Sequence, residues 1–235
     1  VQCYAALHGY KVAVDFDDKF KECAVHNDKY FRRHCHAHMM MQTQINEGDW
    51  VFFIDGDIGV VNPRQFVYIQ VAFANALSNL IEEYLEDGYE IYLFDRFFNW
   101  EVHYIIQYSA NSYLVKNNER GRGWVKEFSK FEFKVPCSLH GNDNGALHPF
   151  MMHYLVPETR NEMAGLCLSL WARSASQEDL FGMEACTRMV IGERTHFPEH
   201  KVKIFQKGEG WAQDLWIFHS HWAADNFMMH SLKEK

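Results

Sequence analysis

The feature that most constrains the fold is an unbroken apolar run, residues 50–54, that leads directly into two acidic residues. A run this short and this apolar is typical of a strand buried on both faces of a parallel sheet. Two further strands are predicted over 90–94 and 112–115, with a helix predicted over 66–86 before the first of them. Strands that alternate with helices predict an α/β fold, in which helices flank a mainly parallel sheet and ligands bind at the carboxyl ends of its strands.

Local patterns set the other expected elements. The apolar spacing predicts helices over 1–8, 29–44, 66–86, 124–133 and 144–154, and alternation predicts a strand over 11–16. No internal repeat, low-complexity tract or linker divides the sequence, so we expect a single domain over residues 1–235.

Charge and hydropathy argue against two classes of function. The 23 Lys and Arg are scattered among 31 Asp and Glu, which gives a net charge of −8, whereas nucleic-acid binding needs a concentrated basic surface. No apolar run approaches the ~18 residues of a membrane span. The sequence starts at Val1 rather than Met, so we expect a fragment of a longer protein. The six cysteines leave open both pairing in an oxidising lumen and free buried thiols.

The two acidic residues after the first run, Asp55 and Asp57, are the strongest candidates for a functional site. Residues two apart on an extended chain share a face, so both carboxylates can reach one hard cation. Gly56 between them leaves room for a ligand to approach the backbone. A cation bound by so few protein groups takes its other ligands from water and phosphate, an arrangement that stabilises a diphosphate leaving group. The pattern therefore predicts a divalent-cation site.

Three other interpretations of this segment are weaker. One carboxylate that caps the next turn, with another that pairs with a base, would explain the pattern without a cation. An EF-hand loop that starts at Asp55 needs Gly at its sixth position and Glu at its twelfth, where the chain has Val60 and Phe66. A phosphatase that uses Asp55 as its nucleophile would have Thr or Val where Gly59 stands.

Ordered sequence blocks along nearly the whole chain resemble a nematode-rich family of nucleotide-diphospho-sugar transferases, distantly similar to fungal and plant α-galactosyl and xylosyl transferases. The blocks are FRRHC (31–35), FIDGDIGVVNP (53–63), IEEY (81–84), DRFFNWE (95–101), SYLVKN (112–117), HGNDNGALH (140–148), KG with WA (207–208 and 211–212) and FMMH (227–230). A set of blocks in this order is far more specific than the acidic pair alone.

The resemblance implies a GT-A (Rossmann-like) fold, a nucleotide diphosphate sugar donor, Mn²⁺ or Mg²⁺ as cofactor, and a glycan or glycoprotein acceptor. It also implies the Golgi lumen of the secretory pathway, with membrane attachment only through a segment outside this sequence. The third metal ligand in relatives is a histidine near the carboxyl end, and His230 matches it. By the same resemblance Asp57 binds the ion, Asp55 binds the ion or the ribose, and Lys233 offsets the diphosphate charge.

The sequence departs from the family pattern in four places. Relatives begin with an apolar strand that forms part of the nucleotide pocket, and none precedes Val1, so we expect the first strand to be missing. Residues 66–79 look like an insertion. Gly56 stands where Ala is usual, which is harmless. Ser231 follows His230 where Gly is usual, which puts a phosphate-binding turn in doubt.

Two further segments are candidates for binding the donor. Arg96, Asn99 and Glu101 follow a predicted strand, so they would face the same cleft as the acidic pair. An arginine beside carboxylates would bind a sugar or phosphate, and the alternative is a structural ion pair. Lys207, before Gly208, would bind a phosphate, and the alternative is an ordinary exposed lysine.

The polar loop of His140, Asp143 and Asn144 opens a predicted helix. Asp143 would bind sugar hydroxyls or act as a base, with Asn144 beside it, and His140 would contact the donor. The alternative is that Asp143 only caps the helix. The family resemblance favours a role in the site.

A cluster of histidines and cysteines suggests a zinc site. Its members are Cys23, His26, His34, Cys35, His36 and His38. Their spacing does not match a standard zinc finger, and a helix directs His34 and His36 to different sides. We therefore expect a packed helix with surface histidines.

Together these features predict transfer of a galactose-like hexose from a nucleotide diphosphate sugar to a glycan hydroxyl. The alternative is a catalytically inactive domain of the same fold that binds sugar or serves as a scaffold, which the missing strand and the insertion favour. Fold alone does not separate the two, whereas metal-dependent hydrolysis of the donor does.

Overall fold

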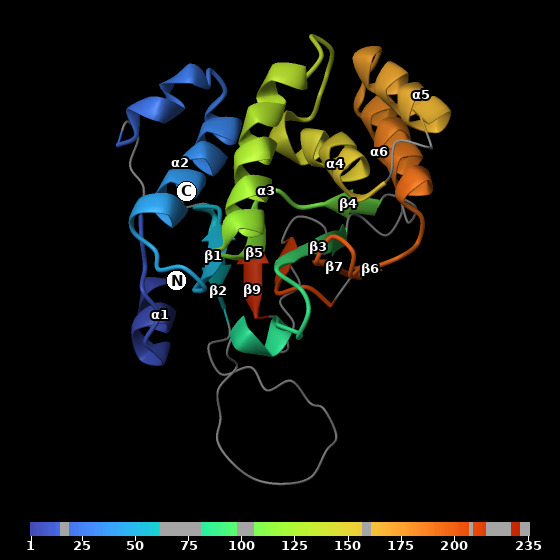
Figure 1. The fold of residues 1–235 in the computed structure, drawn as a ribbon. Helices are drawn as coiled ribbons and strands as arrows, with labels where there is room; N and C mark the ends of the chain where they lie inside the picture. The colour runs from blue at the N-terminus through green and yellow to red at the C-terminus, as the bar shows by residue number, and fades with distance from the viewer. Residues whose placement is uncertain are drawn as a thin grey trace, which may run out of the picture.

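The computed structural model describes residues 1–14, 19–61, 81–97, 106–156, 161–206, 209–214 and 227–230. It has a mixed α/β architecture, with strands beneath a layer of helices (Figure 1). The helices are α1 (Gln2–His8), α2 (Lys29–Thr43), α3 (Glu119–Lys130), α4 (Asn142–Leu155), α5 (Asn161–Ala172) and α6 (Gln177–Ile191), with 3₁₀ turns η1 (Lys21–Val25), η2 (Ile81–Tyr84) and η4 (Phe131–Lys134). The strands are β1 (Trp50–Ile54), β2 (Ile58–Val60), β3 (Ile91–Phe97), β4 (Ile106–Tyr108), β5 (Ser112–Lys116), β6 (His196–Phe197), β7 (Val202–Phe205), β8 (Ala212–Asp214) and β9 (Met228–His230).

The predicted helices over 1–8, 29–44, 124–133 and 144–154 correspond to α1, α2, α3 and α4. Helix α3 begins five residues earlier than predicted, because the Asn118 side chain caps it by accepting a hydrogen bond from the Gly121 amide. A Cβ at Gly121 would lie 2.0 Å from the backbone oxygen of Lys116, so this glycine permits close packing of α3 on β5. That close approach explains why a glycine lies inside this helix.

The larger sheet has the strand order β1-β5-β3-β7-β6, with β4 paired to β3. Within this sheet only β3 and β7 are parallel among the described pairs, so the prediction of a mainly parallel sheet is wrong. The connection between Phe97 and Ile106 is shorter than the dozen or so residues that a crossover needs. Strands β4 and β5 therefore return antiparallel to β3, and β5 pairs antiparallel with β1.

A smaller sheet has the order β2-β9-β8 and joins segments that lie far apart in the sequence. Strand β2 pairs antiparallel with β9, so Ile58 lies opposite His230, and β8 pairs parallel with β9, so Asp214 also lies opposite His230. The chain leaves β1, passes the two predicted acidic ligands and enters β2 at once. This small sheet therefore fixes residues near position 230 beside the acidic pair.

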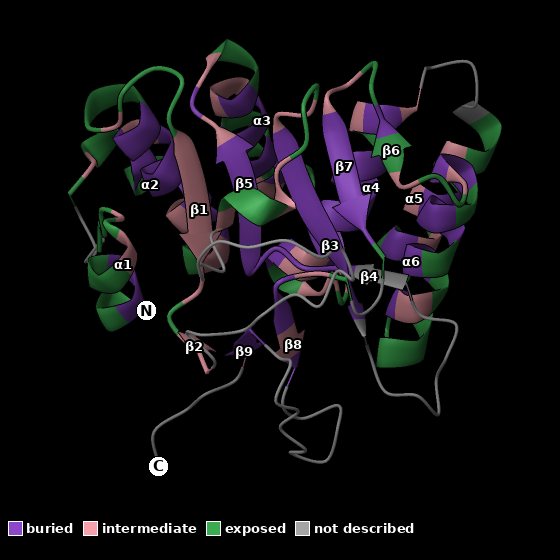
Figure 2. Cartoon of the chain, turned by 90° about the horizontal axis from the view of Figure 1, so that it is seen from below, coloured by how far each residue is buried: buried purple, intermediate pink, exposed green. Residues whose placement is uncertain are grey.

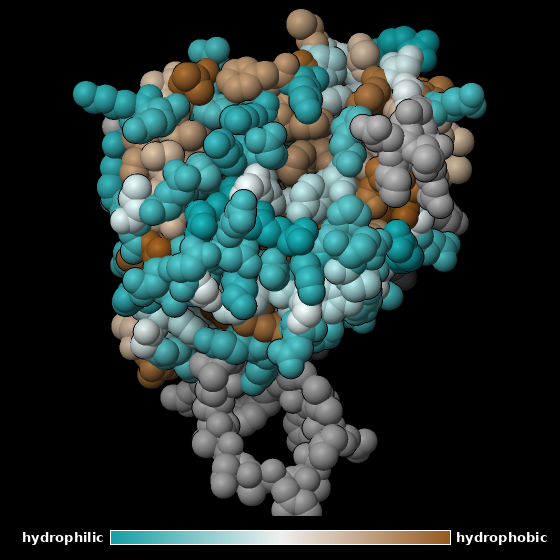
Figure 3. Space-filling view, in the orientation of Figure 1, coloured by the Kyte–Doolittle hydropathy of each residue, from teal (hydrophilic) through white to brown (hydrophobic). Residues whose placement is uncertain are grey.

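Two apolar clusters lie on the two faces of the larger sheet. Between the sheet and the helices pack Phe31, Trp124, Phe128 and Phe150, and β1 contributes partly buried Phe53 to the same cluster. Figure 2 shows the central strands as buried and the helices as buried mainly on the side toward the sheet. On the opposite face the cluster includes Tyr92, Phe94, Leu114, Phe205 and Trp211. Hydrophilic residues cover most of the outer surface seen in Figure 3.

Strand β1 differs from the prediction of a strand buried on both faces. All five of its residues are half-buried, whereas β5 and β7 are almost wholly buried (Figure 2). Among the described strands β1 is the last on its side of the sheet, and this position explains its greater exposure.

Two other expected elements differ from the structure. Residues 11–14 are not a strand, and the rest of the predicted strand 11–16 lies outside the described residues. Of the helix expected over 66–86, residues 81–84 form a single 3₁₀ turn and 85–86 are not helical. The Tyr92 hydroxyl donates to the backbone oxygen of Glu86 and accepts from its amide, which fixes this segment against β3. The insertion proposed over 66–79 lies outside the described residues.

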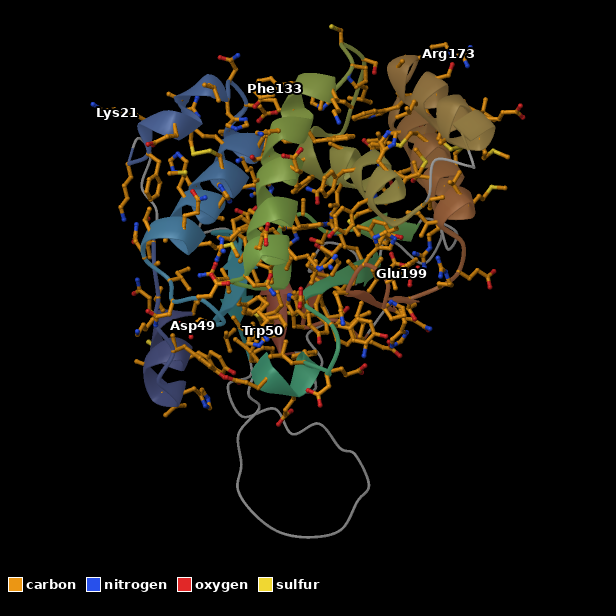
Figure 4. All side chains as sticks on the ribbon, viewed as in Figure 1. Lys21, Asp49, Trp50, Phe133, Arg173 and Glu199 are labelled. Carbon is orange, nitrogen blue, oxygen red and sulfur yellow. A yellow bond between two sulfur atoms is a disulfide. The ribbon has the colours of Figure 1, made fainter. Side chains whose placement is uncertain are left out.

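The cysteines form two disulfides, Cys23–Cys35 and Cys167–Cys186, and Figure 4 draws bonds between sulfur atoms in yellow. Cys3 and Cys137 are free and exposed. The first disulfide removes both cysteines of the zinc hypothesis as thiolate ligands. His26, His34, His36 and His38 are buried, so the expectation of surface histidines is wrong. None of the described helices is both long and apolar enough to span a membrane.

Candidate metal centre

The structure brings together the three metal ligands that the sequence analysis named. Asp55 and Asp57 lie in the turn between β1 and β2, and His230 lies on β9 opposite Ile58. One ligand atom from each of the three side chains lies within 4.8 Å of the other two, and all three residues are half-buried. The short β2–β9 pairing is therefore what delivers the distant histidine to the acidic turn.

The His230 side chain has separate partners for its two nitrogens. Nδ1 forms a short hydrogen bond with Oδ1 of Asp214. A carboxylate only accepts, so we assign the proton to Nδ1, which leaves Nε2 as an acceptor for the Asn111 amide. Nε2 lies 3.2 Å from the Asn111 amide nitrogen and 3.2 Å from Oδ1 of Asp57.

The contact between His230 and Asp57 does not have hydrogen-bond geometry. Oδ1 of Asp57 is buried and has no hydrogen-bond partner within the described structure, although Nε2 of His230 is 3.2 Å away. With the proton on Nδ1, the two facing atoms are both acceptors, and two lone pairs cannot bond each other directly. Two acceptor atoms that lie this close with no proton between them have the arrangement of two ligands that share one cation.

Asp214 orients this histidine and also pairs with Arg96. Arg96 donates from Nε to Oδ2 of Asp214 at 2.9 Å and from Nη2 to Oδ1 at 2.8 Å. Burial raises the pKa of Asp214, but the contacts with His230 and Arg96 outweigh it and lower the pKa below its ordinary value. The carboxylate is therefore ionised at neutral pH. These contacts favour the structural ion pair that was the alternative for Arg96.

Arg33 on α2 connects the acidic turn to the polar loop at α4. Its Nη1 lies 2.7 Å from Oδ2 of Asp55, and its Nη2 donates to Oδ2 of Asp143 at 2.5 Å. Nε of Arg33 also donates to Oδ2 of Asp143, at 3.1 Å, and Nη2 donates to Oδ1 of Asn111 at 3.1 Å. One guanidinium thus spans two carboxylates and an amide.

Asp143 is fully buried in the first turn of α4. Its Oδ2 accepts from Arg33 and from Nε2 of His34 at 3.0 Å, whereas its Oδ1 is buried with no partner among the described residues. Burial raises its pKa, but His34 and Arg33 outweigh that effect and lower the pKa below the ordinary value. Burial has the opposite effect on a histidine and lowers the pKa of His34, so this histidine is neutral and donates to Asp143. The helix cap is Gly141, so Asp143 does not cap α4.

The other residues of the polar loop have different roles. Asn144 accepts from the Ala110 amide at 3.0 Å and donates to Oδ1 of Asn111 at 3.3 Å, so it fixes the turn that carries Asn111. Nδ1 of His140 accepts from the Asn142 amide at 3.1 Å. The hydrogen bonds described for His140 are therefore with its own loop and, through its backbone, with Trp171. The candidates outside the described residues are Asn99, Glu101, Lys207, Ser231 and Lys233.

Four residues of this network were not among the sequence candidates for the site: Arg33, His34, Asn111 and Asp214. Arg33 and His34 lie in one of the sequence blocks that carry the family resemblance, and their place in that block could have identified them. Asp214 could have been found as an acidic residue two positions after another such block, Trp211-Ala212. We find no local sequence pattern that singles out Asn111.

Comparison with known proteins places the chain by family. No curated protein matches it, and no solved structure matches it. One family model covers the whole chain, residues 1–235. The chain therefore belongs to the family described as "Protein of unknown function, DUF273".

Proposed function

We propose that this chain is a metal-dependent glycosyltransferase of the GT-A type. It transfers a galactose-like hexose from a nucleotide diphosphate sugar to a hydroxyl of a glycan or glycoprotein. The observation that carries the proposal is the grouping of Asp55, Asp57 and His230, whose ligand atoms lie within 4.8 Å of one another. Two carboxylates and a neutral imidazole form a donor set that suits Mn²⁺ best and accepts Mg²⁺ through the carboxylates.

The surroundings of these three residues fit a bound cation. Oδ1 of Asp57 is buried without a hydrogen-bond partner in the described structure, and an ion would satisfy it. Nε2 of His230 keeps its lone pair because Asp214 binds the opposite nitrogen, and that lone pair accepts from the Asn111 amide nitrogen at 3.2 Å. This carboxylate–histidine pair is the usual support behind a metal-binding imidazole, since it fixes the ring and raises the basicity of the ligand nitrogen.

The number of protein ligands supports a phosphate-bearing substrate. Three protein groups leave about three positions of a six-coordinate ion for water and substrate oxygens. A bound ion would supply Lewis-acid stabilisation of the diphosphate leaving group. Asp55 directly follows β1, so the candidate site lies at a strand's carboxyl end, where α/β folds bind their ligands.

Asp143 is the residue we assign to the sugar. Its Oδ2 is occupied by Arg33 and His34, whereas the buried Oδ1 has no described partner and is free to accept from a sugar hydroxyl. The lowered pKa makes Asp143 a weak base, so we assign it hydrogen bonding and charge stabilisation rather than proton abstraction. Asn111 and Asn144 support the wall of the site between Asp143 and His230.

Two properties of the whole chain support the proposed partners and compartment. The disulfides Cys23–Cys35 and Cys167–Cys186 favour an oxidising lumen, consistent with a Golgi enzyme. The net charge of −8 argues against nucleic acid as a partner.

Calorimetry with Mn²⁺ and a series of nucleoside diphosphates tests the proposal, followed by an assay of donor-sugar hydrolysis. We expect nucleoside diphosphate binding that requires Mn²⁺, and its loss in Asp57→Asn because one carboxylate ligand becomes a neutral amide. Asp87→Asn is the matched control, since Asp87 is exposed and lies outside the network. Binding that is equally tight without the metal would sink the proposal. Metal-dependent binding with no turnover would instead support the alternative of an inactive sugar-binding or scaffold domain.

A further inference from the structure

Arg33 occupies the Asp55 carboxylate, which the proposed function gives to the metal. Nη1 of Arg33 lies 2.7 Å from Oδ2 of Asp55, and the pair is partly accessible, with side-chain exposures of 19% and 31%. A divalent cation on Asp55 would neutralise the charge that attracts Arg33. The Asp55 carboxylate cannot bind the Arg33 guanidinium and a divalent cation equally well at the same time, so metal binding competes with this ion pair.

The rest of the guanidinium is fixed independently of Asp55. Nε and Nη2 both donate to Oδ2 of Asp143, which is fully buried, and Nη2 also donates to Asn111. The guanidinium carbon lies 5.6 Å from the ring centre of Tyr30 and 5.7 Å from that of Phe53. Loss of the Asp55 contact would therefore leave the group in position, with Nη1 directed at the edge of the metal centre.

We infer that Arg33 changes partner when the site fills: Nη1 leaves Asp55 and donates to a diphosphate oxygen, while Nε and Nη2 stay on Asp143. The inference rests on the proposed function and adds a residue to it. A planar guanidinium with two arms anchored presents its third arm in a fixed direction, which suits an anionic oxygen beside the ion. In this arrangement Arg33 neutralises Asp55 before the metal arrives and binds the substrate anion afterwards.

A purely structural ion pair makes a different prediction, which allows a test. If Arg33 only supported the site, its removal would weaken the binding of both Mn²⁺ and nucleoside diphosphate. If Arg33 changes partner, its removal has opposite effects on the two. The binding of Mn²⁺ alone becomes tighter, because a competitor is lost, and the binding of nucleoside diphosphate becomes weaker, because a charge-assisted donor is lost.

The experiment measures Mn²⁺ alone, and then uridine and guanosine diphosphates at saturating Mn²⁺, by calorimetry on the parent chain, Arg33→Gln and Arg33→Lys. In Arg33→Gln we expect Mn²⁺ to bind about two- to fivefold tighter, the range that a partly exposed ion pair implies. We expect the diphosphate that the parent prefers to bind about tenfold or more weakly. Arg33→Lys keeps the charge without the planar fork, so it should not restore diphosphate binding.

Arg32→Gln is the matched control. Arg32 donates from Nε and Nη2 to the backbone oxygen of His26, at 3.0 and 2.6 Å, so it is a neighbouring arginine on α2 with a partner outside the metal centre. We expect this variant to leave both affinities unchanged. Nuclear magnetic resonance of the parent gives a second measurement that needs no variant to fold. The Arg33 guanidinium signals should move when Mg²⁺ is added and again when the diphosphate follows.

Weaker Mn²⁺ binding in a folded Arg33→Gln would overturn the inference, as would undiminished diphosphate binding or parent Arg33 signals that stay fixed. Failure of the proposed function looks different. If the parent chain binds Mn²⁺ but no nucleoside diphosphate, the proposed substrate class is wrong, and so is the step in which Arg33 donates to a diphosphate oxygen. A parent chain that binds no Mn²⁺ removes both proposals.

Discussion

Replacing Asp214 by Asn tests how far the metal centre depends on the residue behind its histidine. The Asp214 carboxylate accepts from Nδ1 of His230 and from two nitrogens of Arg96. An asparagine has one acceptor oxygen, so whichever way the amide turns, a donor of His230 or Arg96 faces an NH₂ group. The imidazole then loses its orienting charge, and the buried guanidinium loses its ion pair.

The two losses have separate magnitudes. Loss of an outer carboxylate behind a metal-binding histidine weakens metal affinity about 10- to 100-fold, or about 1.4 to 2.7 kcal/mol. The side chain of Arg96 is only 5% exposed, and a buried ion pair that loses one partner costs about 3 kcal/mol of the free energy of unfolding. We therefore expect Asp214→Asn to lower both Mn²⁺ affinity and stability.

A second substitution separates the two effects. Adding Arg96→Gln to Asp214→Asn removes the buried cation that has lost its ion pair with Asp214, so stability should recover in part while metal affinity stays low. Calorimetry with Mn²⁺ and urea unfolding of the metal-free chain give the two quantities. Asp87→Asn is the control, because Asp87 is exposed and lies outside the network. An affinity for Mn²⁺ within twofold of the parent in folded Asp214→Asn would refute the reasoning.

Two further predictions concern buried groups on α4. In Asp143→Asn we expect donor hydrolysis to fall about 100-fold, with a much smaller loss of nucleoside diphosphate affinity, because the proposed function assigns Asp143 to the sugar rather than to the diphosphate. Proportional losses in rate assays and calorimetry would point to a collapsed loop. Burial lowers the pKa of His148 to about 3, so the unfolded state binds a proton that the folded state does not between about pH 3 and 6.5. His148 thus supports stability above pH 6.5 and loses that support as pH falls. His148→Gln should reduce the slope of unfolding free energy against pH by about 1.4 kcal/mol per unit between pH 4 and 6, and an unchanged slope in urea unfolding would contradict this.

The acidic turn was the part of the site most accessible to sequence analysis. An apolar run followed by Asp55 and Asp57 is local, and the structure has the strand and the turn where the pattern put them. His230 came only from the family resemblance, because its position depends on the pairing of β2 with β9, which no local pattern encodes. Arg33 was missed because a cation on an amphipathic helix is ordinarily taken for a solvated residue.

The sequence predicted which segments form strands of the larger sheet, but not whether neighbouring strands run parallel or antiparallel. Apolar runs located β1, β3 and β5 correctly, since burial in a sheet requires them. Whether neighbours run parallel depends on the length and path of the connections. The segment between Phe97 and Ile106 is too short for a crossover, so the chain reverses there although a mainly parallel sheet was predicted. The half-buried β1 shows likewise that an apolar run does not reveal whether its strand is central or last in the sheet.

The pairing of β2 with β9 also sets the order in which the metal centre can be assembled during synthesis. His230 follows Asp57 by 173 residues (230 − 57), so at ~5–20 residues per second the ribosome adds it roughly 9 to 35 s later. Arg33, by contrast, precedes Asp55 by only 22 residues (55 − 33) and is already available when Asp55 emerges. The Arg33 guanidinium can therefore pair with Asp55 early in synthesis, whereas the divalent ion can bind all three of its protein ligands only after His230 has been added.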